Sequence, residues 1–304
     1  MSRTRELMAD LRRRLGADDP LPLPVPLPKV PPPPVRVFPT PRRRSRLADE
    51  AAAHTTALVG IGHVGTRYAT DVVLQFQAEL AVAHHAVAAE LPEDWPARQG
   101  MLLLRTRVDD HREFLLRPDL GRRLREESLA ELTQQATRDV DVQIILADGL
   151  SAVACMGSGV ELASALTAEC QARGWTVGLP VCAKFARVWL QDEIGEAVGA
   201  KVAVIVLGER PGLGTGDGLS AYLVYEPRMG KTDGDRNMMS NIHERGTPPA
   251  QAARRLAVLI GAMLDQQRSG VELDLSQLGT ELGEAAGTGY RAPQVRERLV
   301  ETER

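Results

Sequence analysis

The feature that most constrains the fold of this chain is an unbroken apolar run over 202–207, rich in β-branched residues. Such a run predicts a strand that is buried on both faces of a sheet. It is followed at once by Gly208, Glu209 and Arg210. Because open α/β sheets bind ligands beyond the carboxyl ends of their strands, we favour a binding role for Glu209 and Arg210 over the alternative of a solvated ion pair.

The glycine-rich stretch after this run does not fit a nucleotide-binding motif. Residues 214–218, Gly-Thr-Gly-Asp-Gly, lack the G-x-G-x-x-G spacing, and the apolar run over 221–225 that follows is strand-like. No helix N-terminus is therefore available to hold a pyrophosphate. Residues 230–232, Gly-Lys-Thr, resemble the end of a Walker A loop, but Tyr225 occupies the place of its first glycine and residues 233–235 begin a turn.

From Val140 onward, strand-like and helix-like segments alternate along the chain. The pattern predicts strands over 140–146, 176–182 and 202–207, and helices over 160–173, 192–199 and 247–268. Asp192 and Thr247 are the predicted caps of the last two helices. This alternation predicts an α/β fold with a Rossmann-like, doubly wound and mostly parallel sheet.

The first half of the globular region is predicted to be mainly helical. Long helices are expected over 66–90 and 119–135, with an extended segment or turn over 100–108 between them. The apolar residues that share one face of the first helix are Val73, Phe76, Leu80, Ala83 and Val87.

Composition divides the chain into a body and two tails. Residues 20–41 hold eleven of the twenty prolines, which predicts a polyproline-type spacer, and residues 2–16 can form a short amphipathic helix before it. The predicted organisation follows the chain: a disordered, basic and proline-rich tail over 1–43, a helical domain over 44–125, a Rossmann-like domain over 126–273 and a flexible tail over 274–304.

The net charge of −3 is distributed unevenly. Residues 1–46 hold eleven Lys or Arg and four Asp or Glu, a balance of +7 that leaves −10 on the rest of the chain. A basic tail is typical of nucleic-acid binding, but this tail has one aromatic residue, Phe38, and no binding fold, so we expect no nucleic-acid partner. No run is long enough for a membrane helix and no signal peptide is visible, so we expect a cytoplasmic protein without a membrane partner.

The sequence shows no constellation of its own for catalysis or for metal binding. Cys155, Cys170 and Cys182 lack C-x-x-C spacing, which argues against a disulfide framework or a zinc site and predicts small buried side chains. His243 has no second histidine or cysteine at ligand spacing. No nucleophile stands in a motif with a base, so any chemistry is expected to come from a cofactor that the protein binds and orients.

Three strand exits are expected to meet at one edge of the parallel sheet. They lie at Asp148-Gly149, at 184–188 and at Glu209-Arg210. Asp148 is expected either to make an Asx-turn or to contact a ligand. The segment 235–246 is predicted to be a loop long enough to reach the same edge, and it contains Met238, Ser240, Asn241 and His243.

Several stretches of the chain together carry a resemblance to a known family. They are GERPGLG (208–214), YEPRM (225–229), SNIHERGTPPAQAA (240–253), LRPDLGRRL (116–124), DGLS (148–151) and RVWLQDEIGE (187–196). The chain resembles the small (light) subunit of adenosylcobalamin-dependent ethanolamine ammonia-lyase over about residues 55–273, in the same order. Long, ordered matches are far more specific than a single short motif.

The resemblance implies a lyase subunit that contacts adenosylcobalamin and packs against a large TIM-barrel subunit, in a hetero-oligomer that converts ethanolamine to acetaldehyde and ammonia. No catalytic residue is implied in this chain. The cobalamin contacts of the family fall on Val188, Glu209 and Met238, and relatives carry cysteine at the last of these positions. Since no D-x-H-x-x-G motif is present, the cobalamin is expected to keep its own dimethylbenzimidazole base on cobalt.

Two alternatives stay open from the residues alone. One is a non-catalytic adaptor whose basic tail docks an enzyme to a shell or scaffold, and the other is a stand-alone α/β nucleotide-binding protein. The resemblance implies that in some relatives an N-terminal segment directs packaging into a bacterial microcompartment. A microcompartment shell is therefore an expected partner of the tail.

Overall fold

The computed structural model describes residues 46–52, 63–214, 216–276 and 278. The chain divides into two units, Met1–Val37 and Phe38–Arg304, and all described residues lie in the second unit. The predicted tail over 1–43 therefore lies outside the described residues, as does most of the predicted tail over 274–304.

Short helices and strands alternate with longer ones along the described chain. In order, the elements are α2 (Arg46–Ala52), β1 (His63–Val64), β2 (Arg67–Tyr68), α3 (Thr70–Ala88), α4 (Trp95–Arg98), β3 (Leu102–Arg105), α5 (His111–Leu116), η1 (Leu120–Arg122), α6 (Glu126–Gln135), β4 (Val142–Ala147), α7 (Ala152–Ala154), η2 (Cys155–Gly159), α8 (Val160–Ala172), β5 (Val181–Lys184), α9 (Leu190–Val198), β6 (Val202–Gly208), β7 (Leu219–Tyr225), η3 (Asp233–Asp235), β8 (Arg236–Ile242), α10 (Pro249–Gln266) and η4 (Gly270–Glu272).

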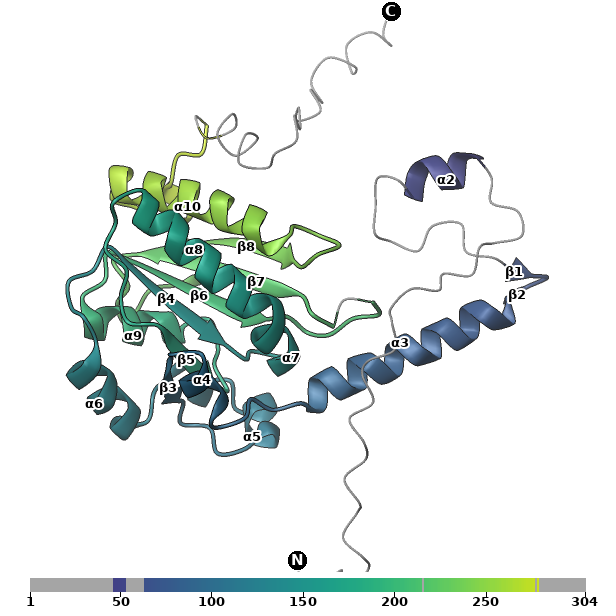
Figure 1. Cartoon of the computed structure of the whole chain (residues 1–304), viewed down its shortest axis with the longest axis horizontal. Helices are drawn as coiled ribbons and strands as arrows, with labels where there is room; N and C mark the ends of the chain where they lie inside the picture. The colour runs from purple at the N-terminus through teal and green to yellow at the C-terminus, as the bar shows by residue number, and fades with distance from the viewer. Residues whose placement is uncertain (1–45, 53–62, 215, 277, 279–304) are drawn as a thin grey trace, which may run out of the picture. The chain divides into compact units, whose positions relative to one another are not determined.

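A six-stranded sheet in the order β3-β5-β4-β6-β7-β8 forms the centre of the second unit (Figure 1). The first four strands in this order are parallel, whereas β7 and β8 pair antiparallel. The α/β class is confirmed, and the sheet is mixed. The reason lies between β6 and β7, where the ten residues 209–218 connect the strands without the crossover helix that parallel pairing requires.

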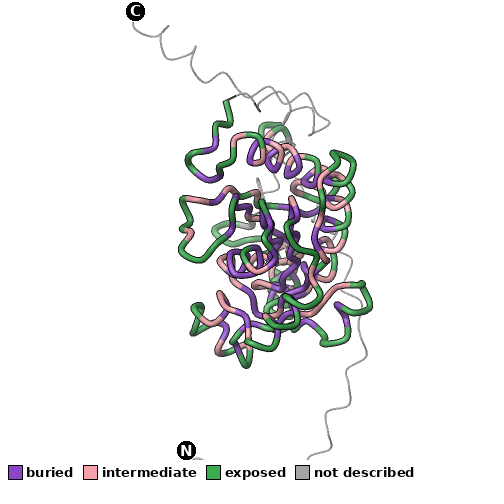
Figure 2. The backbone as a smooth tube through the Cα atoms, turned by 90° about the vertical axis from the view of Figure 1, so that its left-hand side faces the viewer, coloured by how far each residue is buried: buried purple, intermediate pink, exposed green. Residues whose placement is uncertain are grey.

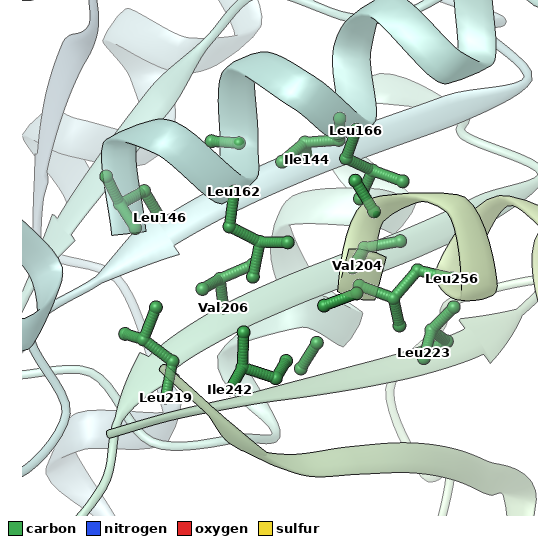
Figure 3. Packing of buried hydrophobic residues seen from close by; sticks show 14 of the residues in the cluster. Ile144, Leu146, Leu162, Leu166, Val204, Val206, Leu219, Leu223, Ile242 and Leu256 are labelled. Atoms are coloured by element: carbon green, nitrogen blue, oxygen red, sulfur yellow. The ribbon is translucent and has the colours of Figure 1, made fainter. Parts of the chain in front are cut away.

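The predicted apolar run becomes β6, which is buried along its whole length between two hydrophobic clusters. Figure 2 shows that buried residues gather in the interior of the described chain. Successive side chains of a strand point to opposite faces, so Val204 and Val206 join the cluster under α8 and α10, and Ile205 joins the cluster under α6 and α9. Figure 3 shows Leu162 of α8 and Leu256 of α10 pointing toward the apolar side chains of the sheet in the first cluster. All three cysteines are free and buried in that cluster, as predicted: Cys155, Cys170 and Cys182.

Several predicted boundaries are wrong, and local chemistry explains why. The predicted strand over 176–182 begins only at Val181, because Pro180 has no N–H for a ladder and Thr176 instead hydrogen-bonds the carboxylate of Asp141. The predicted helix over 119–135 is divided, since Leu124 leaves helical geometry to enter the second cluster. Asp192 and Thr247 do not cap helices, which begin instead at Leu190 and Pro249.

The long helix α3 turns an apolar stripe away from the core. Its buried residues are Val72, Glu79, Ala83 and Ala86, which lie on the face next to the glycine-rich segment after β6. The predicted apolar face is largely on the outside, where the exposed residues of α3 include Val73, Leu74, Leu80 and Val87. The spacing of Val73, Leu80 and Val87 gives the stripe a seven-residue repeat, as in helices that pack along a partner.

The region before residue 126 also contributes to the sheet. Strand β3 pairs in parallel with β5, placing Leu102 beside Val181, and Leu104 is fully buried in the second cluster. The helical character expected for this region is therefore interrupted by one strand of the central sheet. The boundary predicted between a helical and a Rossmann-like domain stays a prediction.

Candidate functional site

The carboxyl ends of β4, β5 and β6 meet at one edge of the sheet. The segment that follows β4 contacts the last residue of β6: the amide of Leu150 donates a hydrogen bond to the carbonyl oxygen of Gly208 at 2.9 Å. A Cβ atom at Gly149 would lie 2.6 Å from that oxygen, and the φ angle of Gly149 is +53°. Only glycine fits this close approach.

Asp148 is an internal clamp at this edge. Its carboxylate is buried and accepts hydrogen bonds from the backbone amides of Phe185 at 2.8 Å and Ala186 at 3.2 Å. Burial raises the pKa of Asp148 to about 6, although these amides and the charge of Lys184 act in the opposite direction. Asp148 therefore fixes the turn after β5, in which Phe185 has a φ of +57°, and the buried carboxylate is not offered to a ligand.

Glu209 follows β6 directly and is held by the two antiparallel strands. Its Oε1 accepts hydrogen bonds from the hydroxyl of Ser220 in β7 and from the backbone amide of Asn241 in β8, the latter at 3.2 Å. No described residue donates to Oε2, and no ion pair joins Glu209 to the exposed Arg210 within the described chain. Glu209 is thus a fixed carboxylate with one oxygen that no described residue contacts, rather than half of a surface pair.

The predicted loop over 235–246 is wrong, since most of it forms the edge strand β8. Met238 pairs with Tyr222, which in turn pairs with Ile205 in the middle of β6. Met238 therefore lies level with the middle of the sheet, and 49% of its surface is exposed. The strand signal in the sequence is weak here because much of β8 is exposed and polar residues are mixed with apolar ones.

Glu209, Ser220, Tyr222 and Met238 share one face of the sheet. Residues that pair across strands point to the same side, as do alternate residues of one strand. Ser220 pairs with Leu207 and Tyr222 pairs with Ile205, and both partners belong to the cluster under α6 and α9. We call the part of this face formed by Glu209, Ser220, Tyr222 and Met238 the open face.

Val188 lies at the border of the open face. It belongs to the segment between β5 and α9 and packs against the second cluster. Three residues later, the side-chain amide of Gln191, oriented to suit its neighbours, donates to the carbonyl oxygens of Tyr222 at 3.0 Å and Ala203 at 3.2 Å. The start of α9 is thereby fixed over β6 and β7, beside the pair of Tyr222 and Met238.

A buried ion pair joins α9 to β8. The guanidinium of Arg236 reaches both carboxylate oxygens of Asp192, at 2.8 Å and 2.6 Å, and both side chains are almost fully buried. Burial raises the pKa of Asp192, although Arg236 opposes the shift. Asp192, predicted as a helix cap, instead anchors the edge strand that carries Met238.

Other features of the described chain lie apart from the open face. A hollow of about 620 Å³ lies where the parallel strands β4 and β6 begin and the antiparallel β7 ends. It is lined in part by Trp175 and Tyr225, and its Lys201 is paired with Asp141 at 2.8 Å. The described residues contain no group of three or more His, Cys, Asp or Glu placed to hold a metal ion. None of the described helices is long and apolar enough to cross a membrane.

A comparison with protein families gives the open face a context. A family model described as ethanolamine ammonia-lyase light chain (EutC) matches residues 46–274, about three quarters of the 304 residues. The chain belongs to this family. The light-chain resemblance of the sequence is confirmed, and the matched range contains Val188, Glu209 and Met238.

Two residues of the open face were not predicted from the sequence. Ser220 and Tyr222 lie in β7, whose sequence Leu-Ser-Ala-Tyr-Leu alternates between apolar and hydroxyl-bearing residues. That alternation could have placed both hydroxyl groups on one side of the strand. The contact between Ser220 and Glu209 could not be read from it, because it depends on the pairing of β6 with β7.

Proposed function

We propose that this chain is the light subunit of an adenosylcobalamin-dependent ethanolamine ammonia-lyase, which converts ethanolamine to acetaldehyde and ammonia together with a large TIM-barrel subunit. Membership of the light-chain family supports the reaction. The observation that carries the role of this chain is the open face. Val188, Glu209 and Met238, the proposed cobalamin contacts, come from three separate segments and lie on this face or at its border.

The residues of the open face fit an amide-rimmed macrocycle. The corrin rim carries amide side chains, whose N–H groups need acceptors, and Oε2 of Glu209 has no donor among the described residues. Tyr222 and Met238 add a surface on which a ring can lie. When bound, adenosylcobalamin supplies the radical chemistry, and the side chains of this subunit bind and orient it.

Met238 stands where relatives carry cysteine, and its role is proposed to be nonspecific. A thioether is apolar and adaptable, so Met238 can follow the shape of the ring without a directed hydrogen bond. Its backbone is fixed by the pairing with Tyr222 whatever its side chain is. Glu209 is therefore the proposed source of directional recognition in this chain.

The exposed stripe of α3 is the proposed contact with the large subunit. A continuous apolar stripe on a helix surface marks an interaction site, and α3 lies inside the range matched by the light-chain family. The opposite face of α3 packs on the segment after Glu209: a Cβ at Gly216 would lie 3.8 Å from Val82 and 3.9 Å from Ala86. A partner on α3 would thus sit beside the helix that packs on the segment after Glu209.

We propose the finer architecture and location on the same basis. Residues 126–273 form a Rossmann-like domain after a largely helical region over 44–125. The protein works in the cytoplasm, and its basic, proline-rich tail links it to a microcompartment shell. The family supports the subunit role, and the tail composition supports the link.

Reconstitution tests the proposed function. The purified chain is mixed with adenosylcobalamin and ethanolamine, with and without the large subunit, and acetaldehyde is measured. We expect turnover only when both subunits are present, because the described residues hold no nucleophile–base pair able to activate an amino alcohol. Turnover by this chain alone would contradict the subunit role. An adaptor or a nucleotide-binding protein would leave the activity of the large subunit unchanged.

A further inference from the structure

The two internal hydrogen bonds of Glu209 fall on the same oxygen. The hydroxyl of Ser220 and the amide of Asn241 both donate to Oε1, while no described residue donates to Oε2. A carboxylate has two equivalent oxygens, so an asymmetric arrangement of donors fixes which one is presented outward. We propose that Ser220 is a positioning residue that orients Glu209 so that Oε2 accepts amide N–H groups of the corrin rim. This inference rests on the proposed function.

The position of Ser220 suits this role. The residue is 5% exposed on β7, where it pairs with Leu207, two residues before Glu209. The hydroxyl has no partner other than Glu209 among the described residues. Because a buried hydroxyl needs a hydrogen-bond partner, the bond between Ser220 and Glu209 fixes the orientation of both side chains.

The second donor is fixed by the backbone of β8. Asn241 has a φ of +59°, and the bulge between β7 and β8 directs its amide toward Glu209. The side-chain oxygen of Asn241 contacts Nε2 of the buried His243 at 2.7 Å, and its carbonyl accepts the amide of Thr247 at 2.9 Å. Because a backbone amide is kept in any ordinary substitution, Ser220 is the donor that a variant can remove.

Loss of the Ser220 hydroxyl should leave Glu209 freer before binding. An oriented side chain binds a ligand more tightly because the entropy of ordering it has already been lost. For one side chain this corresponds to about three- to tenfold in affinity. The effect should act through Glu209, since Ser220 itself is almost fully buried and is not exposed to a ligand on the open face.

A double-mutant cycle tests the inference. Adenosylcobalamin is titrated by absorbance into complexes of the large subunit with wild-type chain, Ser220→Ala, Glu209→Ala and the double variant. We expect Ser220→Ala to weaken binding about three- to tenfold in the wild-type background and less than about twofold in the Glu209→Ala background. The variant Ser220→Thr keeps the hydroxyl and should bind within about twofold of wild type.

Ser269→Ala is the matched control. Ser269 is a second buried serine that serves β7 at its other end, where its hydroxyl accepts the amide of Tyr225 at 2.9 Å and donates to the carbonyl of Asp235 at 2.6 Å. Its loss should affect stability without affecting cobalamin affinity.

The outcomes separate the inference from the proposed function. If Glu209→Ala weakens binding and Ser220→Ala does not, the role of Ser220 is overturned and the site stands. Equal losses for Ser220→Ala with and without Glu209 would show a general structural effect and would also overturn it. If Glu209→Ala binds as wild type does, the assignment of the cobalamin site to the open face fails as well.

Discussion

Among single residues, Glu209 should be the most sensitive cobalamin contact of this chain. A hydrogen bond to a charged group typically contributes about 1.5–3 kcal/mol, so Glu209→Ala should weaken cobalamin binding about ten- to a hundredfold. Met238→Ala should weaken it less, because the contact proposed for Met238 is apolar. Titration of adenosylcobalamin into the assembled complexes measures both values.

A second exposed methionine provides a control for the loss of apolar surface in Met238→Ala. Met229 is 45% exposed, close to the 49% of Met238, and lies outside the open face, so Met229→Ala should leave the affinity unchanged. Assembly with the large subunit should be similar in all variants. Binding of Glu209→Ala within about twofold of wild type would mean that the carboxylate is a solvated group, since a lost charged hydrogen bond costs more.

Asp148 should give the folded chain an unusual dependence on pH. Its pKa is raised from 3.8 to about 6 by burial, so the folded state holds this proton more tightly than the unfolded state. Its contribution to stability is therefore greatest below about pH 4, falls as the pH rises through about 6, and is constant above that. Between pH 5 and pH 7 the contribution should fall by about 1 kcal/mol.

Comparison with Asp148→Asn isolates this contribution. Urea unfolding of both proteins is measured between pH 5 and pH 7, and the difference in unfolding free energy is plotted against pH. Wild type should gain about 1 kcal/mol relative to the variant on going from pH 7 to pH 5. A difference that does not change with pH would show that Asp148 is not the titrating group.

At the scale of elements, the outward stripe of α3 predicts a defined effect on assembly. Leu80→Asp places a charge in the middle of the stripe and should weaken association with the large subunit by at least about tenfold, since desolvating an unpaired charge is costly. Analytical ultracentrifugation of the mixed subunits measures the association. Val271→Asp, at an exposed apolar residue on η4, is the control.

Self-association of this chain, measured without the large subunit, distinguishes between the partners that could bind the stripe. If Leu80→Asp assembles normally with the large subunit but changes self-association of this chain, a second copy binds the stripe instead. In that case the proposed contact of α3 with the large subunit is wrong.

The ion pair between α9 and β8 should matter mainly for stability. Arg236→Ala leaves the carboxylate of Asp192 buried without its partner, which typically costs about 3–5 kcal/mol. Replacing both, as Arg236→Met with Asp192→Leu, should recover most of this loss. Urea unfolding at pH 7 measures both variants, and a loss below about 1 kcal/mol in Arg236→Ala would show that water reaches the pair.

The elements that could be predicted are those with strong local signals. The strand β6 and the helices α8 and α10 follow from continuous or periodic apolar residues. The strand β8 could not, because its place is set by pairing with β7 and much of its length is exposed. The orientation of α3 could not be predicted either, because its apolar periodicity identifies a helix but does not show which face packs on the core.

For the whole molecule, the tail should be dispensable for catalysis. The family match begins at residue 46, and the proline-rich stretch over 20–41 predicts a spacer between the tail and the body. A truncated chain that starts at Ser45 should retain full activity in the complex. Loss of activity despite normal assembly would show that the tail reaches the active site.

The sequence predicts the edge of the sheet at which the candidate site lies, but not which residues share one face there. Parallel strands bring Asp148, the segment before Val188 and Glu209 to one edge, which the sequence pattern indicates. The sharing of one face by Glu209, Ser220 and Met238 depends on the register of an antiparallel pair, which is a contact distant in sequence.

The antiparallel pairing of β7 and β8 also bears on how such a site can change over time. A parallel strand brings with it a crossover helix that covers the sheet, whereas a hairpin adds strands and leaves one side bare. On the open face a side chain such as Met238 touches little of the protein's own interior, so a cysteine and a methionine can be exchanged there without repacking a core. The fold thereby separates the residues proposed to contact the cofactor from those that keep the chain folded.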